Sequence, residues 1–345
     1  MQPIIVSSNE AGQKLFQFLT RRLTVPKSIL HRWIRTGQTR INGKRVTPFT
    51  IVNFKDKIRI PPFAYEYKKK DLTTSLIHNQ YDISPISSHT TSPLPPVIAH
   101  SPEFIIFYKP AGLAVHGGTG QTDSLAHRLS QHYAHSTFMP TPVHRLDKDT
   151  SGLLLVAKTY NSLRYFSELF ASHSTQLTKE YLAWVVGICP WTQPICLEDI
   201  LTKKQKQDNY SRLNSYQNKL QQTSAQKASL TVRCIKQYKD KSLLLIKLHT
   251  GRTHQIRIQL SIHGFPIIGD KKYGNTIRSH NLKLHAFRLS FPGYTFTILP
   301  SWDDKWQVTQ EDIPNIALLN QEMIKIQNKL EHQQTKKMLL FSHLY

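Results

Sequence analysis

Positive charge is distributed unevenly along this chain of 345 residues, and this limits how its first part can fold. Residues 11–70 contain 15 Lys and Arg but only two acidic residues, Asp56 and Glu66. The formal net charge of the whole chain is +23. Such an imbalance opposes compaction unless a polyanion neutralises it, and nucleic acid is the usual polyanion. The charge pattern therefore predicts a nucleic-acid-binding protein.

Hydrophobic residues in this basic segment have the spacing of helices followed by short strands. A helix is expected over 15–23, and a second begins at Pro26 and Ser28 and ends at Gly37. The Asn42-Gly43 pair indicates a hairpin turn between short strands. Those strands are expected at 39–41 and 44–46, with another at 57–60. We predict a compact basic module over residues 11–66.

The composition then changes, which predicts the domain organisation. Residues 67–96 are rich in Ser, Thr, His and Pro and are expected to form a linker. A larger domain is expected over 97–310, interrupted by a polar insertion at about 202–227. The tail at 311–345 is rich in Gln and Lys, which favours a helix, and we assign it no role.

The cysteines and the apolar runs bear on localisation. Three irregularly spaced cysteines predict free thiols in a reducing cytoplasm. The first ten residues have no signal-peptide pattern, and no apolar run approaches the length of a membrane span. We expect a cytoplasmic protein with no membrane partner.

A polar turn that leads directly into a buried strand carries the first candidate site residue. Asp147 lies within two residues of Arg145 and Lys148, and the apolar strand Leu153–Ala157 follows. A carboxylate among cations stays ionised, which suits a nucleophile or general base. The alternative is that Asp147 only forms the turn, and for Asp149 we prefer this structural role.

Metal binding is the next possibility for this turn. Asp147 and Asp149 resemble the start of a calcium-binding loop, but the closing position is Lys158. The 17 histidines show no metal-binding spacing. We therefore predict no metal and reject calcium here.

A second segment places an arginine near the start of a helix. A helix capped by Thr253 is expected to end at Gly264, with Arg252 at its N-terminus. Backbone N–H groups and the helix dipole favour an anion at this end. The anion is either a phosphate or the Asp147 carboxylate.

Two further segments read as strands. In Lys179–Trp184, alternation places Lys179, Tyr181 and Ala183 on one face. Tyr181 is therefore either a packing residue or a platform on which a base stacks. A second strand breaks at Lys109-Pro110, before a glycine turn that lacks the P-loop pattern.

Together these segments resemble the RluA-type family of RNA pseudouridine synthases. The strings that carry the resemblance are HRLDKDTSGLLLVAK, YKPAGLAVH, KEYLAWV and TGRTHQIR, and it covers about residues 97–300. PKSILHRWIRTGQTRINGKRV and DKIRIPP resemble an S4 RNA-binding domain. The combination of an S4-like module with a synthase-like domain is most similar to the RluC-type subgroup, which modifies large-subunit ribosomal RNA.

The resemblance implies an α+β fold, with a small S4-like module and a larger domain built on a mixed, largely antiparallel sheet with flanking helices. It makes Asp147 the catalytic aspartate, Arg252 its charge partner and Tyr181 the residue that packs against the target base. It implies no cofactor. The remaining expected substrate contacts are Arg145, Lys109 and Leu284 in the larger domain and Lys27, Arg32, Arg35, Lys44 and Arg45 in the module.

The resemblance implies an enzyme that isomerises uridine to pseudouridine after the base is flipped out of the RNA. The RNA that it implies as substrate is 23S ribosomal RNA. Asp147 either adds to the base or stabilises the sugar cation, and Tyr181 or a water is the candidate acceptor of the C5 proton. A monomer is favoured. Two rival functions are a non-catalytic ribosome-assembly protein and a metal-dependent nuclease, but the first has no use for the Asp147 segment and the second lacks a carboxylate cluster.

Overall fold

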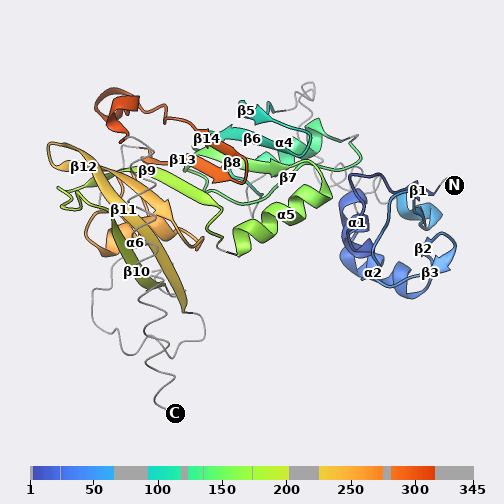
Figure 1. Cartoon of the computed structure of the whole chain (residues 1–345). Coiled ribbons are helices and arrows are strands. Elements are labelled where there is room, and N and C mark those ends of the chain that lie inside the picture. The colour runs from blue at the N-terminus through green and yellow to red at the C-terminus, as the bar shows by residue number, and fades with distance from the viewer. Residues whose placement is uncertain are drawn as a thin grey trace, which may run out of the picture. The chain divides into compact units, whose positions relative to one another are not determined.

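The structure is a computed structural model that describes residues 3–23, 25–65, 92–117, 123–134, 136–172, 174–201, 225–274 and 281–314. Most of the predicted linker and polar insertion and nearly all of the tail lie outside these residues. The chain forms two compact units. Figure 1 labels most of their helices and strands. Unit 1 contains residues 1–108, 114–145 and 154–172, and unit 2 contains 109–113, 146–153 and 173–345.

The basic module in unit 1 has the helices and strands that the sequence predicts. They are α1 (Leu15–Arg22), α2 (Lys27–Arg35), β2 (Arg40–Ile41), β3 (Lys44–Arg45) and β4 (Lys57–Arg59), followed by the 3₁₀ helix η1 (Pro62–Tyr65). The strand β1 (Ile4–Ile5) pairs with β4 and completes an antiparallel sheet of order β1-β4-β2-β3. Sequence alternation could not indicate β1, because it has only two residues. At the predicted hairpin turn, Asn42 and Gly43 both have positive φ, as a type I′ turn requires.

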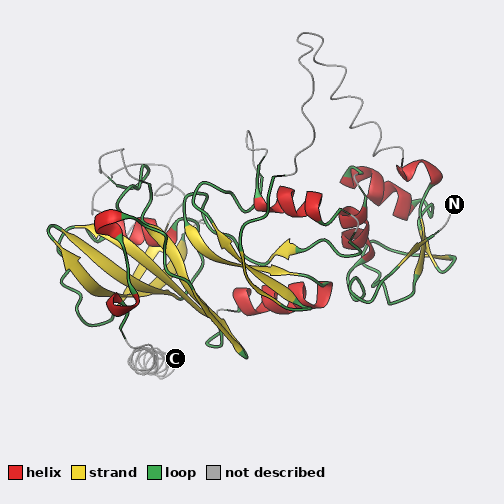
Figure 2. Ribbon diagram, turned by 90° about the horizontal axis from the view of Figure 1, so that it is seen from above, coloured by secondary structure: helices red, strands yellow, loops and turns green. Residues whose placement is uncertain are grey.

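The rest of unit 1 is a small sheet with a helix on either side. Its elements are β5 (Val97–His100), β6 (Phe104–Lys109), α4 (Leu125–His132), β7 (Thr141–Pro142), most of β8 (Ser151–Ala157) and α5 (Tyr160–Ala171). The strands have the order β8-β6-β5, and β7 pairs with β8. In Figure 2, α4 and α5 flank these strands from opposite sides. Ser124 and Thr159 cap the two helices with their side chains, as expected at an N-cap.

Unit 2 contains most of the large mixed sheet. Its elements are β9 (Thr178–Val186), β10 (Ile195–Leu201), β11 (Gln226–Tyr238), β12 (Lys241–Leu248), α6 (Gln255–Ile262), β13 (Leu284–Phe291), β14 (Tyr294–Thr297) and the 3₁₀ helices η3 (Asp304–Trp306) and η4 (Gln310–Asp312). The strand order is β10-β11-β12-β9-β13, with β14 on β13. These pairs are antiparallel, whereas the start of β8 runs parallel to β13. The predicted α+β class is confirmed.

A glycine allows the strand that follows Asp147 to approach β13 closely. Gly152 has φ +117°, and a Cβ built on it would lie 2.2 Å from the carbonyl oxygen of Ala286. No side chain fits at that distance, so glycine is required here. The close pairing of β8 with β13 fixes the position of the turn that carries Asp147.

Two clusters of buried side chains hold unit 2 together. Leu182 and Trp184 of β9 pack with residues of β12 and β13 and with Trp306 and Val308. The helix α6 contributes Ile258 to a second cluster, which contains Leu201 and Ala228. Because Leu182 and Trp184 are in the core, the alternation of β9 leaves Tyr181 on the other face, as predicted.

Candidate active site

The Asp147 carboxylate lies at the centre of a group of charged and polar side chains in unit 2. Its Oδ2 accepts a hydrogen bond from Arg257 NH1 at 3.1 Å, and its Oδ1 lies 3.9 Å from Nε2 of His254. The side chain is 18% exposed. Asp147 is therefore held on one side and still reachable from solvent, as a carboxylate that meets a substrate must be.

Arg257 is fixed by a second carboxylate. Its Nε and NH2 donate to Oδ2 and Oδ1 of Asp270, each at 2.8 Å, in the two-point geometry that guanidinium and carboxylate favour. Burial alone would raise the pKa of Asp270, but these hydrogen bonds and those from the backbone N–H groups of Lys272 and Tyr273 lower it. Burial alone would lower the pKa of the Arg257 guanidinium, but its hydrogen bonds and charge interactions with Asp270 and Asp147 raise it. The three side chains thus form one continuous group in which Arg257 bridges two carboxylates.

The prediction that Arg252 pairs with Asp147 is wrong. Nε of Arg252 donates to the carbonyl of Lys227 at 3.1 Å, and Arg257 pairs with Asp147 instead. The helix begins at Gln255, and its N-cap is His254 in the left-handed region, not Thr253. Gln255 Oε1 accepts hydrogen bonds from Thr250 Oγ1 and the backbone N–H of Arg252, which folds the preceding residues into a turn. Arg252 therefore lies before the helix and Arg257 lies within its first turns.

Tyr181 lies close enough to Asp147 for that carboxylate to affect its ionisation. Burial raises the pKa of the Tyr181 hydroxyl, and the negative charge of Asp147 raises it further. In the sheet register Tyr181 is opposite Ala286 and Ala183 is opposite Leu284, so Leu284 lies on the same face as Tyr181. Both side chains are buried, at 8% and 3% exposure. This face carries an aromatic ring, which lies near Asp147, and an aliphatic side chain on the neighbouring strand.

His254 is the other side chain next to Asp147, and no sequence pattern singled it out. Its Nδ1 lies 2.9 Å from the hydroxyl of Tyr273, and the two rings meet edge to face. Tyr273 also lies under the guanidinium of Arg257, 5.2 Å from ring centroid to Cζ. Tyr273 thus contacts both Arg257 and His254, which flank the Asp147 carboxylate.

Lys109 supports the turn that contains Asp147. The side chain is completely buried, and its Nζ donates to the carbonyls of Pro110, Leu113 and Lys148 at 2.8, 2.8 and 2.9 Å. Burial lowers the pKa of Lys109 to about 8, although the charges of Asp149 and Asp147 oppose this shift. An ammonium that uses its three donors on backbone carbonyls has a structural role rather than a substrate-binding one.

We expect Lys109→Met to lower the free energy of unfolding by about 2–4 kcal/mol, because three carbonyls would be deprived of their common donor. Denaturant unfolding measures the change. Lys148→Met is the matched control, since Lys148 is exposed and only its carbonyl takes part in this arrangement. Equal effects of the two substitutions would contradict the structural role of Lys109.

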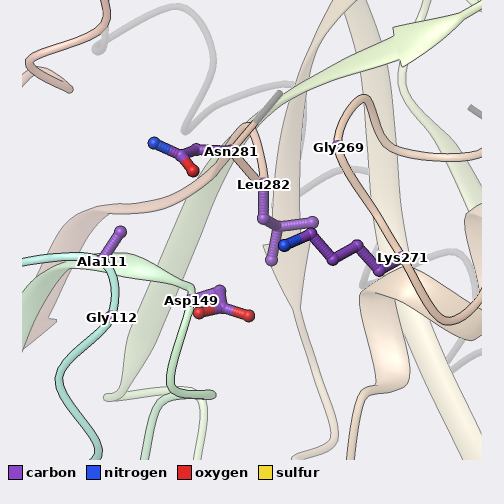
Figure 3. A pocket seen from close by; sticks show the side chains of 7 residues that line it. All are labelled: Ala111, Gly112, Asp149, Gly269, Lys271, Asn281 and Leu282. Atoms are coloured by element: carbon purple, nitrogen blue, oxygen red, sulfur yellow. The ribbon is translucent and has the colours of Figure 1, made fainter. Parts of the chain in front are cut away.

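A pocket of about 130 Å³ opens beside the same turn (Figure 3). It is lined by Ala111, Gly112, Asp149, Gly269, Lys271, Asn281 and Leu282. Figure 3 shows Lys271 extending toward Leu282 from the right, with the Asn281 amide at the upper left and the Asp149 carboxylate at the lower left of that leucine. Asp149 thus lines a pocket beside the turn, and its structural role in that turn stays a prediction.

The other predicted substrate contacts are placed in unit 1. Arg145 is exposed, and its charge adds to the effect of burial in lowering the pKa of His116. All five basic residues expected to contact RNA in the module are exposed: Lys27, Arg32, Arg35, Lys44 and Arg45. Their ammonium and guanidinium groups are therefore accessible to phosphates.

Metal sites and membrane spans are both absent from the part of the chain that the structure describes. No group of three or more His, Cys, Asp or Glu among these residues could hold a metal ion. Within the same ranges, no helix is long and apolar enough to span a bilayer. The three cysteines are free thiols.

Comparison with known proteins identifies the family. A family model described as RNA pseudouridylate synthase matches residues 103–262. The chain is 31% identical over 298 residues to "Ribosomal large subunit pseudouridine synthase C" of Buchnera aphidicola, covering 84% of this chain and 88% of that protein. It is 32% identical to the protein of the same name from Haemophilus influenzae, covering 84% and 86%. A solved structure, "Human RNA Pseudouridylate Synthase Domain Containing 4", matches at 24% identity and TM-score 0.49, covering 59% of this chain and 88% of that one.

The chain belongs to the RluA-type family of RNA pseudouridine synthases. It is an isomerase that acts on RNA, and both rival functions, a non-catalytic assembly protein and a metal-dependent nuclease, are set aside.

Proposed function

We propose that this enzyme converts uridines of large-subunit ribosomal RNA, 23S RNA in bacteria, to pseudouridine, with Asp147 as its catalytic carboxylate. The observation that carries the catalytic part is the Asp147–Arg257–Asp270 arrangement, which holds one partly exposed carboxylate in a fixed position. The substrate part rests on the relatives, which are named for the large ribosomal subunit and match over most of their length.

The roles of the surrounding residues follow from their positions. Arg257 orients Asp147 and limits its freedom to rotate, while Asp270 keeps Arg257 from pairing with Asp147 through both donors. Tyr181 packs against the flipped uracil, and Leu284 contacts it from the neighbouring strand. Burial keeps the Tyr181 hydroxyl protonated by raising its pKa, which suits a packing platform better than a base.

The reaction exchanges one bond of C1′ for another. The bond from N1 to C1′ breaks, the base turns, and C5 bonds to C1′. An ionised Asp147 assists either by adding to the base or by stabilising the positive sugar. Neither route requires a metal or a cofactor, and we propose that the enzyme uses none.

The proposed substrate is tested by incubating the enzyme with unmodified transcripts of 23S and 16S ribosomal RNA and mapping pseudouridines in both. We expect conversion at defined uridines of the 23S transcript only. Conversion confined to the 16S transcript would overturn the proposed substrate while leaving the enzyme class intact. Mapping in ribosomes from cells that lack the gene checks the same positions in vivo.

We further propose that the basic module anchors the RNA and takes no part in the chemistry. Replacing Arg32 and Arg35, both exposed on α2, with alanine is expected to weaken RNA binding. The slope of log affinity against log salt should fall by about 1 for each phosphate that the variant no longer neutralises. Turnover at saturating RNA should remain unchanged.

Filter binding at several salt concentrations and single-turnover kinetics measure these two effects. Alanine is a good helix former, so both exposed positions accept it without a decrease in helix stability. Lys305→Ala, at an exposed position in unit 2, is the control, because it removes one positive surface charge outside the module. An unchanged salt slope for the double variant would show that these arginines do not contact phosphate.

A further inference from the structure

We propose that His254 is the general base that removes the proton from C5 after the base has rejoined the sugar, with Tyr273 as the residue that positions its imidazole. The proposal rests on the proposed role of Asp147, because it requires the uracil to react beside that carboxylate. It assigns a catalytic residue to a step for which the sequence suggested only Tyr181 or a water.

The position of His254 is the first argument. Its Nε2 lies 3.9 Å from Oδ1 of Asp147, and the side chain is 22% exposed. A uracil that reacts with Asp147 or beside it must therefore come within reach of the imidazole. The separation exceeds hydrogen-bond length, so Nε2 is not tied up in a hydrogen bond with Oδ1.

The imidazole of His254 is also held in place. Nδ1 bonds to the Tyr273 hydroxyl at 2.9 Å, and when Nδ1 carries the proton, the lone pair of Nε2 faces Asp147. His254 also adopts φ 54° and ψ 25°, the left-handed region that residues other than glycine rarely occupy. Such backbone strain persists where the surrounding structure enforces it, and here the enforcing contacts are the hydrogen bonds of Gln255 in the preceding turn.

The other ionisable groups near Asp147 are poorly suited to accept a proton. Burial raises the pKa of Tyr273 to about 12, and the pKa of the Tyr181 hydroxyl is shifted in the same direction, so both stay protonated near neutral pH. The Lys109 ammonium uses its donors on three backbone carbonyls. Burial lowers the pKa of His254; the charge of Asp147 opposes this, and Arg257 and Lys272 support it. His254 is therefore neutral near pH 7 and available to accept a proton.

The step balances in atoms and electrons. After C5 has bonded to C1′, C5 is tetrahedral and still holds its hydrogen, and C6 is doubly bonded to N1. Nε2 takes the C5 proton, and the C5–H electron pair restores the double bond between C5 and C6. The C6–N1 pair returns to N1, which accepts a proton from water. His254 then releases its proton to solvent, so that no net oxidation or proton change occurs.

The test separates bond exchange from proton removal. The enzyme is given the same RNA with uridine, with uridine deuterated at C5, and with 5-fluorouridine at the target position. Fluorine cannot leave as a cation, so the fluorinated RNA reports bond exchange alone. The variants are His254→Gln and, as matched control, His263→Gln at the other end of α6, where the imidazole bonds to Asp199.

For His254→Gln we expect uridine conversion to fall about 10²-fold, the usual contribution of a general base. Deuterium at C5 should then slow the variant more than it slows the wild type, because proton removal has become rate-limiting. Rearrangement of 5-fluorouridine should proceed at the wild-type rate. Tyr273→Phe should show the same pattern with a smaller decrease, as a positioning residue would.

The pH profile gives an independent readout. In the wild type, turnover should fall on the acidic side as His254 is protonated, at a pH below the usual histidine pKa of about 6.5. The charged and titratable groups that face His254 are Asp147, Arg257, Asp270, Lys272 and Tyr273. His254→Gln should remove this acidic limb.

Equal decreases on uridine and 5-fluorouridine would overturn the proposal, since His254 would then act in bond exchange or in folding. Full activity of His254→Gln with no increased isotope effect would also overturn it and would assign the proton to Asp147 or water. An error in the catalytic role proposed for Asp147 can be distinguished from both outcomes. If Asp147→Asn still rearranges 5-fluorouridine, the proposed catalytic carboxylate is wrong whatever His254 does.

Discussion

Asp147→Asn is expected to reduce pseudouridine formation on the order of 10⁴-fold or more, below the detection limit of most assays. Asparagine is nearly isosteric with aspartate, but it has no negative charge with which to add to the base or to stabilise a sugar cation. Single-turnover assays on the mapped ribosomal RNA site measure the decrease.

The fold should tolerate this change, because Arg257 keeps its two-point contact with Asp270 and is not left unpaired. We expect the melting temperature to change little, and RNA affinity to stay equal or rise since one negative charge facing the RNA is removed. Asp149→Asn is the control, because Asp149 lines the neighbouring pocket and makes no contact with Arg257. Substantial turnover by folded Asp147→Asn, or complete inactivity only in Asp149→Asn, would show that the other carboxylate is catalytic.

The elements of the fold were largely predictable because their signals are local. Helical spacing and the Asn42-Gly43 turn indicated the module, and alternation indicated the faces of β9. The two-residue strand β1 has no periodicity of its own and exists through its pairing with β4. The linker, insertion and tail predictions concern residues mostly outside the described ranges and stay predictions.

The candidate site was predictable only in part, and Arg252 shows why. Two arginines lie five residues apart in the same segment, and the choice between them depends on where the helix begins. The sequence favours a cap at Thr253, whereas in the structure the Gln255 side chain closes the turn and the helix starts at Gln255. A left-handed residue before the helix is not encoded in hydrophobic spacing, so Arg257, Asp270 and the pairing of His254 with Tyr273 required the structure.

The second substitution with a large expected effect on the reaction rate lies in the group formed by Asp147, Arg257 and Asp270. Arg257→Lys is expected to lower single-turnover conversion about 10²-fold, the usual decrease when one fixed electrostatic partner is removed from a reaction centre. Lysine keeps the positive charge, but one ammonium cannot bind Asp270 at two points and also donate to Asp147 in a fixed direction. RNA affinity should change little, because the Arg257 side chain is 11% exposed and pairs with carboxylates rather than with phosphate.

Arg252→Lys is a matched control within the same segment. Its guanidinium donates to a backbone carbonyl and has no carboxylate partner among the residues that the structure describes, so we expect near-normal conversion. Measuring rate and affinity for both variants separates the two assignments. A large decrease in rate for Arg252→Lys with normal turnover in Arg257→Lys would show that Arg252 is the charge partner of Asp147 after all. Equal decreases in rate and affinity for Arg257→Lys would identify Arg257 as a phosphate contact, and the carboxylate arrangement would then be structural rather than catalytic.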